Sequence, residues 1–139
     1  MKKSKEEILA SCNAICKNTL METLGIEFID VTEDSLIAKM PVTSRVHQPD
    51  GILHGGASVA LAESIGSAAA IVFMGPEVVS IRGIVISANH VKSVKDGYVY
   101  ARATALHNGR TTQLWQIRIT NENDELVSII KLTTIAFYQ

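Results

Sequence analysis

The chain has 139 residues, 47% of them hydrophobic and 19% charged, which fits one folded domain over residues 1–139. This composition excludes an intrinsically disordered protein, and the low charge points to surface that is buried between subunits. Thirteen lysines and arginines stand against fourteen aspartates and glutamates, and this net charge of −1 argues against a nucleic-acid partner.

A helical pattern runs from Lys5 to Leu24 and ends at Gly25, a residue type common at helix C-termini. We interpret its two cysteines, four residues apart, as reduced packing residues rather than a disulfide. Two glutamates at positions 6 and 7 interrupt the apolar stretch that a secretory signal needs, so we expect a cytoplasmic protein. The side chains that define the apolar face are Ile8, Leu9, Cys12, Ile15, Cys16, Thr19 and Leu20.

Two β-rich runs follow, at Ile26–Val31 and Leu36–Val42, with the polar turn cluster Thr32–Ser35 between them. This pattern predicts a short antiparallel pair of strands. A loop over residues 43–56 then contains Pro49-Asp50-Gly51, which is typical of a turn.

A second helix is predicted from Ala57 to about Met74, ended by Gly75-Pro76. Nearly every position in it is small or apolar, and a helix that is apolar on all sides is expected to be buried on all sides. Glu63 and several serines interrupt the run, which favours a helix inside the protein over a membrane span.

The last part of the chain contains four β-rich runs, which predict a four-stranded antiparallel meander. Asp96-Gly97 and Asn108-Gly109 are strong signals for two-residue hairpin turns, and a looser turn is expected at residues 121–124. With the earlier pair the sheet has about six strands, long enough to coil around the apolar helix, so the predicted fold class is α+β. The runs are Val79–Val94, Tyr98–His107, Thr111–Thr120 and Leu126–Tyr138.

Glu63 is the most informative residue for function, because it is the one ionisable group in the apolar helix. An unpaired carboxylate in apolar surroundings costs several kcal/mol, as expected for a residue kept as a base or nucleophile. The alternative is that Glu63 emerges at an exposed edge of the helix. Ser67 lies four residues further on the same face, where it holds the carboxylate or a water, or serves as a small packing residue.

His54-Gly55-Gly56 precedes the same helix, and backbone amides at a helix N-terminus suit an anion or an oxyanion. A flexible junction between loop and helix would explain the two glycines equally well. Glu63 follows Gly55 by eight residues, which is roughly 12 Å along one helix and too far for both to contact one carbon atom. This spacing suggests that the two groups of one site come from two subunits with antiparallel helices.

The segment from His47 to Gly56, followed by Ala57 to Ser64, resembles the signature of the hotdog-fold acyl-CoA thioesterases. The similarity is greatest to the PaaI-like group, which includes the 4-hydroxybenzoyl-CoA thioesterases of the Arthrobacter type and the dihydroxynaphthoyl-CoA thioesterases. It covers the whole chain in element order and implies a long central helix wrapped by a curved sheet, with an N-terminal helix.

The resemblance implies an enzyme that hydrolyses a small acyl-CoA, aromatic or medium-chain, to the free acid and CoA, without a metal or cofactor. Glu63 would be the nucleophile or general base. The Gly55 amide would bind the oxyanion, His54 and Gln48 would orient the thioester, and Ser67 would position water. A homotetramer, a dimer of dimers with active sites at the dimer interface, is implied as well.

Contacts to substrate and CoA are expected from a second group of residues. Arginine suits the phosphate groups of CoA because its planar guanidinium forms paired hydrogen bonds. Arg82 and Arg110 are the candidates, and the alternative for each is an ordinary surface charge. The expected contacts are Gly56, Arg82, Asn89, His90 and Arg110.

Two other functions remain open at this point. A non-catalytic acyl-CoA-binding hotdog module would not need Glu63. A hotdog dehydratase would instead use a histidine with an acid, without the Gln48, His54-Gly55-Gly56 and Glu63 arrangement. Scattered histidines without paired ligand spacing argue against a metal site.

Overall fold

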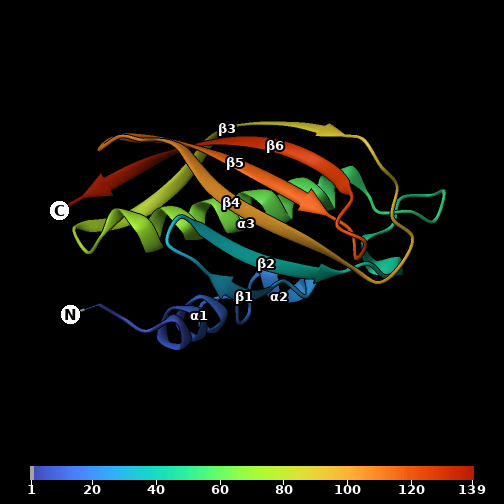
Figure 1. Cartoon of the computed structure of the whole chain (residues 1–139), viewed down its shortest axis with the longest axis horizontal. Helices are drawn as coiled ribbons and strands as arrows, with labels where there is room; N and C mark the ends of the chain where they lie inside the picture. The colour runs from blue at the N-terminus through green and yellow to red at the C-terminus, as the bar shows by residue number, and fades with distance from the viewer. Residues whose placement is uncertain (1) are drawn as a thin grey trace.

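The structure is a computed structural model that describes residues 2–139, and it confirms a six-stranded antiparallel sheet curled around one long helix (Figure 1). The sheet order is β1-β2-β4-β5-β6-β3. The elements are α1 (Lys5–Ala14), α2 (Leu20–Leu24), β1 (Glu27–Val31), β2 (Ser35–Pro41), the short 3-10 helix η1 (Ser44–Val46), α3 (Gly55–Met74), β3 (Val78–His90), β4 (Tyr98–Asn108), β5 (Thr112–Thr120) and β6 (Leu126–Tyr138).

The N-terminal region contains two helices, so the prediction of one continuous helix to Leu24 is wrong. Asn18 takes a left-handed φ of 62°, and the Thr19 side chain caps α2 by accepting a hydrogen bond from the Met21 amide. Polar side chains that bond to nearby backbone compete with a continuing helix, which explains the break. Gly25 ends α2 with a φ of 74°, as predicted.

Both cysteines pack in the core, as the sequence suggested. Cys12 and Cys16 are buried free thiols, and the Cys16 thiol donates a hydrogen bond to the Cys12 carbonyl. Burial raises the pKa of both thiols above the ordinary value.

The predicted β1–β2 pair and its polar turn are confirmed, but only part of the meander is. Strands β4, β5 and β6 follow one another, whereas β3 pairs with β6 at the sheet edge and β4 pairs with β2. The hairpin predicted at Asp96-Gly97 is therefore wrong. The chain after β3 crosses the end of the sheet, where the Val91 amide bonds to the Val127 carbonyl and the Leu53 amide to the Val94 carbonyl.

The Asn108-Gly109 hairpin does join β4 to β5, but not through a two-residue turn. Asn108 pairs with Gln113, so four residues form the connection. Tyr138 donates a hydrogen bond to the Arg110 carbonyl, and the Gln113 side chain donates one to the Gly109 carbonyl. These bonds hold a wider loop than the local signal indicated.

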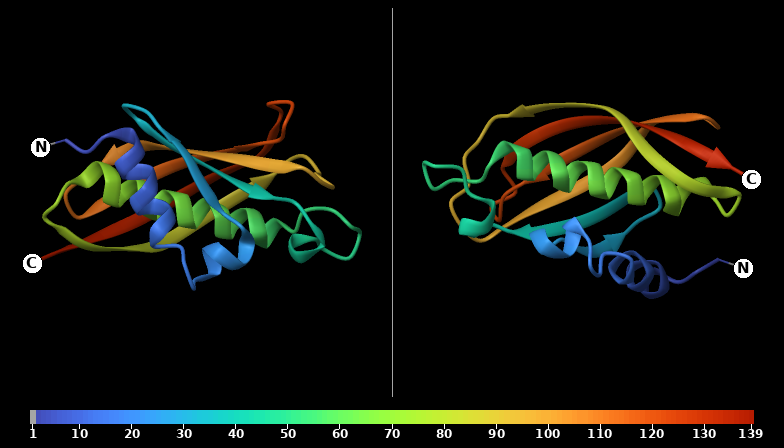
Figure 2. Two further views of the ribbon diagram at one scale, coloured as in Figure 1. Left: turned by 90° about the horizontal axis from the view of Figure 1, so that it is seen from below. Right: turned by 180° about the vertical axis from the view of Figure 1, so that it is seen from behind.

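Helix α3 lies along the concave face of the sheet, with β3 on one side and β2 on the other (Figure 2). Leu61, Ile65 and Ala69 are fully buried against the sheet, yet Glu63 and Ile71 are exposed. The expectation of burial on all sides is therefore wrong for the single chain, because the sheet covers only one side. Although α3 is long and apolar enough to cross a bilayer, it packs lengthwise on the sheet.

Gly66 allows the close approach of α3 to β6. A Cβ added there would lie 2.5 Å from Cδ2 of Leu132, which is fully buried. We expect Gly66→Ala to lower the free energy of unfolding by about 1–3 kcal/mol, because overpacking exceeds the gain of roughly 1 kcal/mol in helix propensity. Urea denaturation measures this change.

The matched control is Ser64→Ala, which removes only a hydroxyl bonded to the Ala60 carbonyl of the same helix. It should change the stability by less than about 1 kcal/mol. A Gly66→Ala protein as stable as the wild type would contradict tight packing against Leu132.

Candidate functional site

The loop before α3 is ordered by its own hydrogen bonds. The Gly51 amide donates to the Gln48 carbonyl, the Gln48 amide donates to the Ile52 carbonyl, and the Gln48 side chain accepts from the Asp50 amide. Gly51 has a φ of 75°, so the predicted turn is confirmed. The loop therefore holds Gln48 beside the start of α3.

The first turn of α3 leaves one amide unpaired. His54 caps the helix: its Nδ1 accepts from the Gly56 amide at 2.8 Å, so a neutral His54 ring carries its proton on Nε2. The amides of Ala57 and Ser58 donate to the His54 carbonyl. Within residues 2–139 the Gly55 amide donates no hydrogen bond, and it lies at the positive end of a 20-residue helix.

His90, the last residue of β3, lies against Gly55. A Cβ added to Gly55 would be 2.9 Å from both Cδ2 and Nε2 of the His90 ring, so only a glycine fits. The other ring nitrogen, Nδ1, is 2.7 Å from Oγ of Ser128 on β6. This contact fixes the ring beside the unpaired amide.

A cavity of about 330 Å³ opens at this end of α3. Three predicted site residues, Gln48, Gly55 and His90, line it together. Lys92 also reaches it, 3.4 Å from Glu125, whose pKa is held below the ordinary value by the Asn121 side chain and by Lys92. The other lining residues are Ile52, Leu53, Ser58, Val91, Ser93, Val127 and Ser128.

Glu63 lies two turns further along α3 and does not line this cavity. Its side chain is on the exposed side of the helix, as in the alternative left open above, and its carboxylate rests over Gly83 of β3. Ser67 is half-buried one turn beyond it. The single chain therefore holds the carboxylate and the unpaired amide apart, as the helical spacing predicts.

The other predicted substrate contacts are not gathered at the cavity. Asn89 is exposed on the opposite face of β3 from His90, because neighbouring residues of a strand point to opposite faces. Arg82 is exposed near the other end of β3 and donates a hydrogen bond to the Ile81 carbonyl. The Gly56 amide is already occupied by His54.

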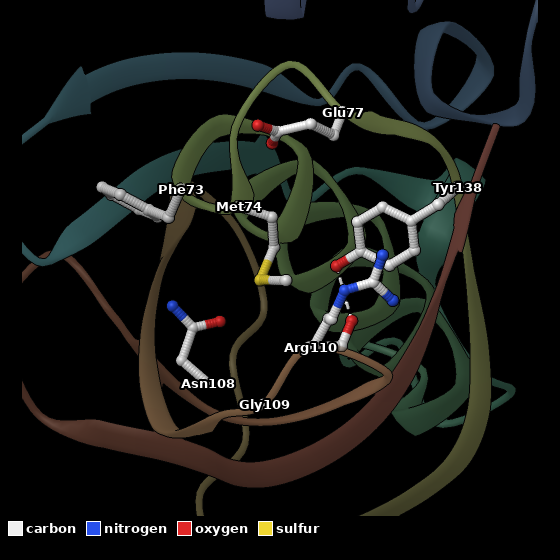
Figure 3. A pocket seen from close by; sticks show the side chains of 7 residues that line it. All are labelled: Phe73, Met74, Glu77, Asn108, Gly109, Arg110 and Tyr138. Atoms are coloured by element: carbon white, nitrogen blue, oxygen red, sulfur yellow. Dashed lines mark hydrogen bonds between the residues drawn. The ribbon is translucent and has the colours of Figure 1, made fainter.

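Arg110 lies beside a second cavity, of about 540 Å³, at the C-terminal end of α3 (Figure 3). Its guanidinium carbon is 4.0 Å from the centre of the Tyr138 ring. Phe73, Met74, Glu77, Asn108 and Gly109 complete the lining. Arg110 and the cavity at Gly55 are thus at opposite ends of the helix.

Sequence reasoning missed Gly83, although a signal was available. A lone glycine inside a β-rich run often marks a bulge or a close approach. The structure has both at this point: the register shifts between Gly83 and Val85, and the Glu63 carboxylate lies over the glycine.

In the part of the chain that the structure describes, no three His, Cys, Asp or Glu residues form a group that could hold a metal ion.

Comparisons with known proteins agree on one family. The sequence profile of the "Thioesterase superfamily" matches residues 50–128. A 1,4-dihydroxy-2-naphthoyl-CoA hydrolase of Escherichia coli is 44% identical over 126 residues, covering 91% of this chain and 92% of the relative. The proofreading thioesterase EntH of Cronobacter turicensis is also 44% identical over 126 residues, with 91% of each chain covered.

Solved structures show the same likeness. The crystal structure of a thioesterase from Haemophilus influenzae matches with a TM-score of 0.91 and 40% identity. The match covers 99% of this chain and 93% of that one. The α+β architecture described above is thus the hotdog thioesterase fold expected from the sequence.

Proposed function

This chain belongs to the thioesterase superfamily and is a thioester hydrolase, and we propose that Glu63 and the Gly55 amide hydrolyse a small acyl-CoA to the free acid and CoA. The observation that carries this proposal is the unpaired Gly55 amide at the N-terminus of α3, in a cavity shared with Gln48 and His90. An aromatic or medium-chain acyl group is proposed. The relative named as a dihydroxynaphthoyl-CoA hydrolase supports the aromatic class.

The chemistry needs a carboxylate and an oxyanion donor on one thioester carbon. Glu63 either attacks the carbonyl carbon itself or takes a proton from the attacking water. In both cases the carbonyl oxygen becomes negative and accepts the Gly55 amide hydrogen. One such donor contributes about 2.7–4 kcal/mol to transition-state stabilisation. The C–S bond then breaks and CoA leaves as a thiolate, which takes a proton from Glu63 in the general-base route and from solvent in the nucleophilic route. In the nucleophilic route water then hydrolyses the acyl-Glu63 anhydride and frees the acid. Ser67 is proposed to position the water in either route.

Glu63 and Gly55 of one site are proposed to come from two copies of the chain. The long edge strand β3 supports this, because its outer edge is unpaired within the described residues. Ile84 and Val85 on that strand are 53% and 62% exposed. A second copy pairing along β3 would cover these apolar side chains and complete the hydrogen bonds of the edge.

The register of this pairing follows from two contacts. Glu63 rests over Gly83, and Gly55 lies against His90. An antiparallel pair that places Gly83 beside the partner's His90 therefore brings Glu63 to the partner's Gly55. Because the register shift leaves Ile84 as an extra, unpaired residue, the two-fold axis then passes through position 87, midway along the residues that pair.

The same register supports a role for one arginine. It places Arg82 beside the partner's Val91, and Val91 lines the cavity at Gly55. We propose that Arg82 contacts a CoA phosphate there and that His90 and Asn89 contact the rest of CoA. Gln48 and His54 orient the thioester, and the Gly56 amide supports this turn through its bond to His54. Arg110 would contact CoA only if the nucleotide reaches the second cavity.

A homotetramer built from two such dimers is proposed for the assembly. The exposed face of α3, including Ile71 at 50% exposure, would be covered by the second dimer.

The two free, buried thiols agree with a cytoplasmic protein, which we propose as its location.

The test is release of free thiol from benzoyl-, hydroxynaphthoyl-, hexanoyl- and palmitoyl-CoA by the purified protein. We expect turnover of the aromatic or medium-chain thioesters, and the best substrate identifies the acyl class. Turnover of palmitoyl-CoA alone would overturn the proposed substrate class. Binding of CoA without turnover of any thioester would favour the non-catalytic binding module.

A further inference from the structure

Gly83 lies directly beneath the carboxylate of Glu63. A Cβ added to Gly83 would lie 2.8 Å from Oε2 and 3.2 Å from Cδ of Glu63. Real Cβ atoms almost never approach an oxygen so closely, so any side chain at position 83 would move the carboxylate. The place that Glu63 occupies exists only because β3 has no side chain there.

A second glycine brings the helix to this point. Gly66, three residues after Glu63, faces Cδ2 of Leu132, and Gly83 faces Cδ1 of the same leucine. Leu132 is fully buried on β6 and pairs with Ile86 of β3. One buried leucine therefore lies between the two glycines, and it fixes how closely α3 packs against β3 and β6.

The backbone does not by itself require a glycine at position 83. Gly83 has no left-handed φ, unlike Gly25, Gly51, Gly75 and Gly97. A glycine inside a strand lowers stability by roughly 0.5–1 kcal/mol relative to alanine. An alanine Cβ at position 83 would lie 3.2 Å from Leu132 Cδ1, a contact that a small shift relieves. The feature that an alanine would disturb is therefore the space that the Glu63 carboxylate occupies.

We propose that Gly83 is a positioning residue for Glu63. Because Gly83 has no side chain, the Glu63 carboxylate can lie directly over the backbone of β3, beside the unpaired edge of the strand. This inference rests on the proposed function, in which Glu63 attacks the thioester or activates water. The register shift immediately after Gly83 bends the strand at the same point. Gly83 thus contributes by leaving space and makes no contact with the substrate.

The experiment compares Gly83→Ala with the wild type in steady-state kinetics on the best thioester of the panel. We expect kcat to fall roughly 10²-fold, as for a misplacement of a catalytic group by about 1 Å, with KM changed less than about threefold. Thermal unfolding and elution volume should stay close to the wild type. Ser80→Ala, on the outer face of the same strand, is the control for a small change in β3 and should keep full activity.

A second background separates positioning from a structural role. Glu63→Asp shortens the acid by one methylene group, which withdraws it from a Cβ at position 83. In that background Gly83→Ala should lower kcat less than about threefold, because the two effects are coupled. Equal losses in both backgrounds, or a loss explained by dissociation of the oligomer, would overturn the inference.

The proposed function can fail separately from this inference. Full activity of Glu63→Gln would remove the role of Glu63 itself and the inference with it. An inactive Glu63→Gln beside a fully active Gly83→Ala would leave the proposed function intact and reject Gly83 alone.

Discussion

Replacing Glu63 with glutamine is expected to lower kcat by roughly 10²–10⁴-fold, the range contributed by a positioned acid or base. Glutamine has nearly the shape of glutamate but neither takes a proton nor attacks a thioester. KM should change little, because Glu63 is proposed to act on the reacting carbonyl carbon and not to hold the rest of the acyl-CoA. Release of free thiol by wild-type and variant protein measures the effect.

The fold should not change in this variant. The Glu63 side chain is exposed and forms no ion pair among the described residues, so the variant should elute as the same oligomer. Glu33→Gln, in the exposed turn between β1 and β2, is the matched loss of a carboxylate and should keep full activity. If Glu63→Gln retains more than about a tenth of the wild-type kcat, Glu63 is not the catalytic carboxylate.

Replacing Gly55 with alanine is expected to lower kcat by about 10²–10³-fold, the effect of losing one oxyanion donor. The added Cβ would lie 2.9 Å from the His90 ring, which is held by Ser128, so the helix N-terminus must shift. The same thioester assay measures this loss. A substrate with a longer acyl chain should show the same relative loss, because the donor acts on the reacting carbonyl.

Combining the Glu63→Gln and Gly55→Ala chains in one oligomer tests whether Glu63 and Gly55 of one active site come from two different chains. Co-expressed Glu63→Gln and Gly55→Ala chains with different tags form hybrids in which one site has both defects and the other has neither. Purified hybrids should recover about half of the wild-type activity. If both groups of a site came from one chain, every site would carry one defect and no activity would return.

Much of the fold follows from local patterns in the sequence. The 3.6-residue pattern, Gly25 and Gly75-Pro76 predicted the helices and two of their ends, and the polar turns predicted the β1–β2 and β5–β6 connections. The break after α1 was missed because Asn18 and Thr19 compete with the helix only through their own side-chain bonds. Elements were thus predictable where neighbouring residues decide them.

The order of the strands was not predictable from such patterns. The turn signal at Asp96-Gly97 indicated a hairpin, but β3 pairs with β6, and the paired residues are about 40 to 60 positions apart in the chain. A hairpin there would place β3 beside β4, whose two edges are taken by β2 and β5. Competition among long-range pairings decided the outcome, and no short segment carries that information.

The sequence by itself determined the groups that we propose carry the chemistry: one acid in an apolar helix, two glycines at its start, and a spacing that keeps them apart. Only the tertiary structure decided their surroundings. It placed His90 against Gly55, set the Glu63 carboxylate over Gly83, and left Arg110 and Asn89 away from the cavity. The physical reason is that helical spacing fixes distances along one element, whereas contacts between α3, β3 and β6 depend on packing between segments far apart in the chain.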